Sequence, residues 1–235
     1  MKKAKNISRF RSSCVIIKGT LIERGILLTF NENAFRKVIQ NYSPKPIGKP
    51  YQYSVLLPLV FYQDEWHVLY EVRSSNISQP GDTSFPGGKI ENNESFEEAA
   101  VRECCEELTL SRDKIEVIGQ IDYIVNERVM VYCFVGILHE IEVNKICPND
   151  LEVDYVFTLP LNYFLSNEPT YYSATTITKT IEGFPYHLMA QGEKYVFRSA
   201  KRAIPFYDLP NGEFLWGYTA NMTHRFIEIL KEFGK

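Results

Sequence analysis

Four charged side chains stand within one short stretch of the sequence: Arg102, Glu103, Glu106 and Glu107. On a helix, residues three and four positions apart share a face, so the three carboxylates would lie together. Like charges at this spacing destabilise a helix by a few tenths of a kcal/mol per pair, and a compensating partner is expected. A cluster of carboxylate oxygens suits Mg²⁺ or Mn²⁺ better than zinc. The alternative is a solvated acidic helix face without a ligand.

The residues around this cluster suggest what such an ion would do. Gly87 and Gly88 allow a tight backbone turn, which would let a carbonyl oxygen join the ligands. Arg102 could hold a carboxylate in orientation through a bidentate contact. Magnesium commonly binds through a few carboxylates together with substrate phosphates. The pattern therefore indicates metal-assisted attack of water on a phosphoryl group.

A helix must position these carboxylates, and the sequence predicts where it begins. Ser95 followed three positions later by Glu98 forms a capping box, which marks a helix N-terminus. The helix is expected to run to about Thr109. Apolar residues recur near helical spacing and predict one buried face; they are Phe96, Ala99, Ala100, Cys104 and Leu108.

The rest of the chain supplies strands and further helices. Paired strands are predicted at 52–62 and 65–73, joined by Gln63-Asp64, and at 114–125 and 128–138, around Asn126-Glu127. Helices are expected at 32–41 and at 217–233, the second with candidate buried residues Ala220, Met222, Phe226, Ile229 and Leu230. Residues 150–165 predict a strand leading into a short helix, residues 166–213 an irregular region with short strands, and residues 14–30 a small hairpin or an extension. Strands alternating with helices predict a mixed sheet covered on both faces.

Composition limits the class of protein. The chain has 235 residues, 45% of them hydrophobic and 23% charged, which is typical of a globular protein. A net charge of −3 gives no basic excess for nucleic acid, and no apolar run is long enough for a membrane span. The five cysteines show no CxxC spacing, so neither zinc nor a disulfide framework is indicated. We predict a cytoplasmic protein, with an organelle presequence in the basic N-terminus as an open alternative.

The glycine, the carboxylates and their spacing together resemble the Nudix box. That motif has the form G-x5-E-x7-R-E-U-x-E-E-x-G-U, where U is aliphatic. The matching positions here are Gly88, Glu94, Arg102, Glu103, Glu106, Glu107 and Leu110. Thr109 replaces the second glycine, which would end the helix in a left-handed conformation. This replacement is expected to alter the exit turn without removing a ligand.

The resemblance implies an α/β/α sandwich with a mixed β-sheet and a metal-dependent hydrolase acting on a nucleoside diphosphate derivative. Glu103, Glu106 and Glu107 would bind Mg²⁺ or Mn²⁺, and Gly87 would add a carbonyl oxygen. Arg102 would orient a glutamate, and Glu94 would support the loop or the metal shell. The general base would be Glu103 or an acid from a distant loop, for which Glu152 is the first candidate and Glu127 the second.

The segment before the box resembles that of coenzyme A diphosphatases within this superfamily. Its Arg-Ser pair and its Phe-Pro-Gly-Gly turn match, so Arg73, Ser74 and Phe85 are the implied substrate-binding residues. Residues 151–165 and 215–227 also look similar to this subfamily. One departure concerns a second arginine after the Arg-Ser pair, where this chain has Asn76-Ile77-Ser78. That loss puts strict specificity for coenzyme A in question, because the 3′-phosphate would lose a contact.

These observations predict hydrolysis of coenzyme A or its thioesters to 3′,5′-ADP and a 4′-phosphopantetheine species. One alternative is a different diphosphate substrate, such as NADH, ADP-ribose or a dinucleoside polyphosphate. The other is a Nudix-like binding domain without turnover. We expect residues 1–31 to form an N-terminal extension of unclear role and residues 32–235 to form the hydrolase domain. The expected partner is a small nucleotide rather than nucleic acid or a membrane, and homodimer formation is left open.

Overall fold

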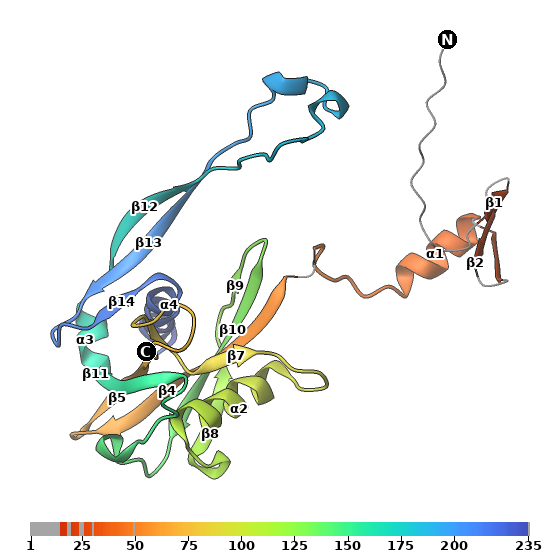
Figure 1. Ribbon diagram of the computed structural model, residues 1–235. Helices are drawn as coiled ribbons and strands as arrows, with labels where there is room; N and C mark the ends of the chain where they lie inside the picture. The colour runs from red at the N-terminus through yellow and green to blue at the C-terminus, as the bar shows by residue number, and fades with distance from the viewer. Residues whose placement is uncertain (1–14, 18–19, 24–25, 30, 49, 235) are drawn as a thin grey trace. The chain divides into compact units, whose positions relative to one another are not determined.

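The structure is a computed structural model that describes residues 15–17, 20–23, 26–29, 31–48 and 50–234 (Figure 1). The chain divides into two compact units, one up to Ile47 and one from Gly48 onward, and each is described by itself. The domain boundary predicted between residues 31 and 32 stays a prediction. Cys14 and the basic N-terminus lie outside the described residues.

The described residues of the first unit form three short antiparallel strands and one helix. The strands β1 (Val15–Ile17), β2 (Thr20–Glu23) and β3 (Ile26–Thr29) pair in sequence order, which extends the predicted hairpin by one strand. The predicted helix is confirmed as α1 (Glu32–Gln40). Asn31 caps it, because its side chain accepts a hydrogen bond from the backbone N–H of Ala34 at 2.9 Å.

The second unit is built on a mixed sheet. Its main path has the order β11-β5-β4-β10-β8, and three short strands pair onto its sides. Parallel pairing joins β4 to β10, whereas all other pairs in this sheet are antiparallel. The strands are β4 (Tyr51–Tyr62), β5 (Glu65–Arg73), β6 (Thr83–Ser84), β7 (Gly87–Lys89), β8 (Ile115–Gln120), β9 (Ile124–Val125), β10 (Val129–Leu138) and β11 (Val153–Pro160). The two predicted strand pairs are thus confirmed, with a break at residues 121–123.

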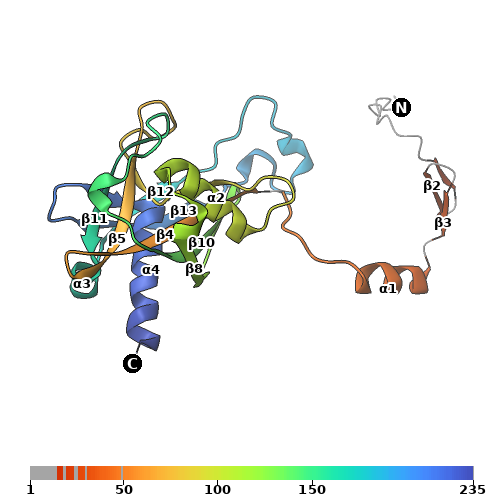
Figure 2. The same ribbon diagram turned by 90° about the horizontal axis from the view of Figure 1, so that it is seen from below.

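Helices cover both faces of this sheet (Figures 1 and 2). Alternate residues of β4 point to opposite faces, so Leu56 and Leu57 enter different cores. The core containing Leu56 is closed by α2 (Phe96–Leu108). The opposite core is closed by α3 (Leu161–Ser166) and α4 (Gly217–Phe233). The predicted α/β/α sandwich with a mixed sheet is therefore confirmed.

The predicted short strands within residues 166–213 are present as a second sheet. Its strands are β12 (Thr170–Thr176), β13 (Ala200–Asp208) and β14 (Phe214–Trp216), paired antiparallel in that order. Phe206 pairs with Trp216 across the last two strands, and their rings stack with centroids 5.7 Å apart. This register brings β13 beside the start of α4.

The C-terminal helix α4 buries most of the predicted face. Ala220, Met222 and Phe226 are buried as expected, whereas Ile229 and Leu230 are half-buried. Ile227 is buried instead, which shows that the apolar stripe is rotated slightly from the predicted one. Among the helices of the described residues, none combines the length and apolar character needed to cross a bilayer.

Candidate active site

Helix α2 begins with the predicted capping box. The Ser95 hydroxyl accepts a hydrogen bond from the Glu98 backbone N–H at 3.2 Å, and the Glu98 carboxylate accepts one from the Ser95 backbone N–H at 2.7 Å. These reciprocal bonds satisfy two N–H groups that have no partner within the helix. They fix the start of the helix and therefore the rotational positions of all later carboxylates.

The C-terminus of α2 differs from the expectation for Thr109. This residue adopts the left-handed conformation, with φ 55° and ψ 42°, so the exit turn is retained despite the missing glycine. The expected change in the turn is thus wrong. A β-branched residue rarely occupies this region, because its side chain crowds the backbone. Thr109 is therefore locally strained, and the exit turn keeps its left-handed conformation.

Arg102 is the centre of an ionic network on the outer side of α2. Its guanidinium donates to both oxygens of Glu94, at 2.9 and 3.1 Å, and to Glu103 and Glu106 at 2.8 and 3.1 Å. The contact raises the pKa of Arg102 and lowers the pKa of Glu94. Arg102 therefore holds three carboxylates in fixed positions, while its part in catalysis stays a prediction.

Gly87 and Gly88 lie in strand β7, which pairs antiparallel with β4, so the tight turn predicted at these glycines is wrong. The extended backbone still brings both residues against the carboxylates. The Gly87 backbone N–H donates to Glu107 at 2.7 Å. A Cβ atom at Gly88 would overlap the present position of the Glu103 carboxylate, so a larger residue would displace this side chain. A Cβ atom at Gly87 would overlap the backbone of β4. Glycine is thus required at position 87 for the strands to approach, and the proposed role of the Gly87 carbonyl is untested.

A further carboxylate, Glu71, lies in this region and is missing from the sequence-based site. It stands in the middle of β5, with 1% of its surface exposed. One of its oxygens accepts a hydrogen bond from the Ser84 hydroxyl at 2.8 Å, whereas the other, Oε2, has no hydrogen-bond partner within the described residues. The sequence does contain a signal for Glu71, because this acid interrupts the apolar residues 68–72 of the strand. A charge buried among apolar residues needs a compensating partner, which indicates a functional site.

Four carboxylates form the acidic cluster: Glu71, Glu103, Glu107 and Glu152. Burial raises the pKa of Glu107, and the nearby charge of Glu71 raises it further. Burial likewise raises the pKa values of Glu71 and Glu103. Glu152 also contributes to all three shifts, which places the loop before β11 beside the helix. The repulsion predicted from the sequence is therefore real and is strengthened by burial.

The acidic cluster fits a divalent cation in its chemistry. All its donors are carboxylate oxygens, and Glu71 Oε2 is buried without a partner. Within the described part of the chain, however, no three acidic, histidine or cysteine side chains converge closely enough to form a preformed metal site. Arg102 explains part of this result, because it already binds Glu103 and Glu106. Among the described residues, the hydrogen bonds from Arg102 go to Oε1 of Glu103 and to Oε2 of Glu106, so the second oxygen of each carboxylate is left for an ion.

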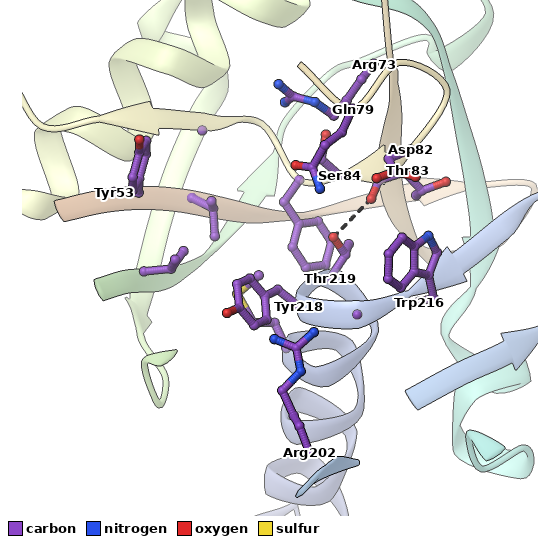
Figure 3. A pocket seen from close by; sticks show the side chains of 16 residues that line it. Tyr53, Arg73, Gln79, Asp82, Thr83, Ser84, Arg202, Trp216, Tyr218 and Thr219 are labelled. Carbon is purple, nitrogen blue, oxygen red and sulfur yellow. Dashed lines mark hydrogen bonds between the residues drawn. The ribbon is translucent and has the colours of Figure 1, made fainter. Parts of the chain in front are cut away.

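Figure 3 shows the side chains that line a cavity of about 430 Å³, and hydrogen bonds from two of the lining residues connect it to the acidic cluster. Gly87 and Ser84 line it, and each donates a hydrogen bond to a member of the cluster, Glu107 and Glu71 respectively. Its other walls carry aromatic and basic side chains, a combination suited to a nucleotide. These side chains are Tyr53, Arg73, Phe85, Arg202, Trp216 and Tyr218.

Of the three substrate-binding residues predicted from the sequence, the structure places two in the cavity wall and one outside it. Arg73 and Phe85 line the cavity, and the Arg73 guanidinium donates to the Ser78 carbonyl at 2.8 Å. Ser74 is buried outside the cavity lining, where its hydroxyl accepts from the Asn76 backbone N–H at 3.1 Å. The Ser74 backbone N–H donates to the Glu152 carbonyl, so Ser74 links the β5 loop to the acidic cluster. Glu127 lies in the exposed turn between β9 and β10.

Comparison of the sequence with known protein families identifies the family to which this fold and site belong. The NUDIX domain family matches residues 51–170, and this chain therefore belongs to the Nudix hydrolase superfamily. The match includes β4, β5, β7, α2 and β11, and so contains the whole acidic cluster.

Individual relatives include two coenzyme A diphosphatases. The peroxisomal coenzyme A diphosphatase NUDT7 of Mus musculus is 34% identical over 140 residues, which cover 58% of this chain and 57% of that protein. The mitochondrial coenzyme A diphosphatase NUDT8 of Homo sapiens is 29% identical, and the alignment covers 57% of this chain and 58% of that protein. The chain thus matches little more than half the length of either relative.

Two other matches extend over more of the chain. Nudix hydrolase 3 of Caenorhabditis elegans is 25% identical over 216 residues, which cover 86% of each protein. A crystal structure of a MutT/nudix family protein from Enterococcus faecalis is 15% identical, with a TM-score of 0.45. That comparison covers 86% of this chain and 70% of the other.

Proposed function

We propose that this protein is a metal-dependent diphosphatase that hydrolyses coenzyme A or its thioesters. The products would be 3′,5′-ADP and 4′-phosphopantetheine or its acylated form. The observation that supports the proposal most is the buried acidic cluster beside a cavity whose walls carry aromatic and basic side chains. The similarity to two coenzyme A diphosphatases supports the choice of substrate.

In the proposed reaction, water attacks one phosphorus of the diphosphate. A new P–O bond forms to the water oxygen, the bridging P–O bond breaks, and the second phosphate leaves with the bonding electrons. A bound Mg²⁺ or Mn²⁺ would neutralise the developing negative charge and lower the pKa of water. Glu103, Glu106 and Glu107 would hold the ion, and Glu71 would add a buried oxygen that has no hydrogen-bond partner among the described residues.

The remaining residues would position the reactants. Glu152 is proposed as the base that accepts the proton from water, with Glu103 as the alternative, because both belong to the acidic cluster. Arg102 would orient Glu103 through their 2.8 Å contact. Arg73, at the cavity wall, would contact a phosphate of the substrate.

Incubation with coenzyme A and Mg²⁺, followed by mass detection, tests this function. We expect 3′,5′-ADP and 4′-phosphopantetheine in equal amounts, and no product when EDTA removes the ion. Parallel reactions with NADH and ADP-ribose measure preference. Faster turnover of either compound would replace the proposed substrate but retain the diphosphatase reaction. No turnover of any of them would indicate a binding domain instead.

A further inference from the structure

Two arginines line the cavity, and they differ in what they bind. Arg73, at the end of β5, donates to the Ser78 carbonyl through its guanidinium. Arg202, in the middle of β13, takes part in none of the ion pairs formed among the described residues. Its guanidinium carbon lies 5.7 Å from the centroid of the Tyr218 ring. Arg202 thus makes a cation–π contact with Tyr218, and among the described residues no hydrogen bond or ion pair occupies its guanidinium donors.

The surroundings of Arg202 favour an anionic ligand. Asp82 is the single carboxylate among the residues that line the cavity, and the acidic cluster lies beyond Gly87 and Ser84. A stacked guanidinium binds phosphate through two parallel hydrogen bonds, which a lysine cannot reproduce. Figure 3 shows the guanidinium groups of Arg73 and Arg202 on different sides of the cavity.

A second observation indicates a polar ligand in the same cavity. Thr83 lines it and is 6% exposed, and its hydroxyl oxygen has no hydrogen-bond partner within the described residues. Trp216 and Tyr218 supply aromatic surface beside it, which suits a base or ribose. Buried hydroxyl groups rarely stay unpaired, so a ligand atom is the natural partner for Thr83.

We propose that Arg202 and Tyr218 form a phosphate subsite for a phosphomonoester that is separate from the diphosphate being hydrolysed. The proposal rests on the proposed function and sharpens it. The acidic cluster and Arg73 hold the diphosphate at one side, and Arg202 selects nucleotides that carry a further phosphate on the ribose. The 3′-phosphate of coenzyme A has this chemistry, whereas NADH and ADP-ribose lack such a group.

Binding of two nucleotides that differ by one phosphate tests the subsite without turnover. Calorimetric titration would compare adenosine 3′,5′-bisphosphate with AMP. We expect the wild-type protein to bind the bisphosphate at least tenfold more tightly, and Arg202→Ala to reduce this ratio below threefold. The affinity for AMP should change less than twofold, because AMP lacks the phosphate that Arg202 binds. Arg202→Lys should give an intermediate ratio.

Lys201→Ala is the matched control. Lys201 is the preceding residue of the same strand, so its side chain points to the opposite face, and it is absent from the cavity lining. This variant removes one positive charge and should keep the wild-type ratio. An equal loss of preference in both variants would mean a general charge effect and would overturn the subsite. The same conclusion follows if the wild type shows no preference or if Arg202→Ala retains it.

Turnover of coenzyme A separates this proposal from the proposed function. A protein that hydrolyses coenzyme A but whose preference is independent of Arg202 overturns the subsite alone. A protein that leaves coenzyme A intact yet shows the Arg202-dependent preference overturns the proposed function and supports the subsite.

Discussion

Two neighbouring parts of the candidate site are built in opposite ways: the acidic cluster, here called the acidic end, and the part of the cavity wall that carries Arg202, here called the other end. At the acidic end, carboxylates crowd against one another and burial raises their pKa values. At the other end, Arg202 rests on the ring of Tyr218, and Trp216 stacks on Phe206. Under the proposed function, a cation would stabilise the first end and an anion the second. A diphosphate carrying a further phosphate, together with a divalent ion, would satisfy both ends at once.

The two ends also differ in how the chain assembles them. Two of the four carboxylates at the acidic end, Glu103 and Glu107, come from one capped helix, and the other two come from β5 and from the loop before β11. The other end joins β13 to the start of α4, and its geometry depends on the pairing of Phe206 with Trp216. This difference explains which parts of the site could be predicted from the sequence. Because the two ends are built from different elements, we expect substitutions at each end to have different effects.

The largest expected effect is at the acidic end. Glu107→Gln should lower turnover roughly 100-fold or more, because it removes a proposed ligand charge from the ion that activates water. The fold should persist, since a glutamine oxygen can still accept the hydrogen bond from Gly87. Steady-state kinetics with coenzyme A measure the loss. Glu97→Gln, on the exposed part of the same helix, is the control, and an equal loss there would contradict the assignment.

The acidic end should also make stability depend on pH. The pKa values of Glu71 and Glu107 are raised from 4.5 to about 7 and about 9, so the folded protein binds more protons than the unfolded chain between pH 5 and 9. The free energy of unfolding should therefore fall as pH rises through this range, by up to about 1.4 kcal/mol per pH unit for each extra proton bound.

Denaturant unfolding in EDTA would measure this slope, and Mg²⁺ should reduce it because the ion binds ionised carboxylates. Glu71→Gln removes one of the two groups and should flatten the curve between about pH 5 and 7. Stability that increases with pH in EDTA would show that the carboxylates are not crowded in the way described.

A smaller effect is expected at the end of α2. Thr109→Gly should raise the free energy of unfolding by about 1 kcal/mol, because glycine adopts the left-handed conformation without steric cost. Turnover should change little, since Thr109 contacts neither end of the cavity. Thr109→Ala is the comparison, as it retains a Cβ atom and should give a smaller gain. A loss of stability with glycine would mean that the Thr109 side chain makes favourable contacts.

The smallest expected effect concerns the ring beneath Arg202. Tyr218→Ala should weaken binding of adenosine 3′,5′-bisphosphate about threefold, consistent with about 0.5–1 kcal/mol for an exposed cation–π contact. Tyr218→Phe keeps the ring and should bind nearly as well, although it loses the hydrogen bond from Asn126. Equal losses in both variants would assign the effect to the hydroxyl rather than to stacking.

The sequence predicts those parts of the protein that depend on local spacing. The capping box, α2 and the two long hairpins are confirmed, because each depends on neighbouring residues. The turn predicted at Gly87 and Gly88 is wrong, because pairing with β4 holds these residues in strand β7. Glu71 was missed because its importance comes from burial, which tertiary packing decides. Arg202 and Trp216 could not be predicted, since only the register of β12, β13 and β14 brings them to the cavity. Thr109 departs from the motif in residue type but not in backbone conformation.

Direct binding of Mn²⁺, followed by electron paramagnetic resonance, tests the central claim that the acidic cluster is a divalent metal site. We expect one tight site in the wild-type protein and at least a tenfold loss of affinity in Glu107→Gln and in Glu71→Gln. Glu97→Gln should bind as the wild type does. Unchanged Mn²⁺ affinity in both cluster variants would contradict the claim, because the ion would then be held elsewhere.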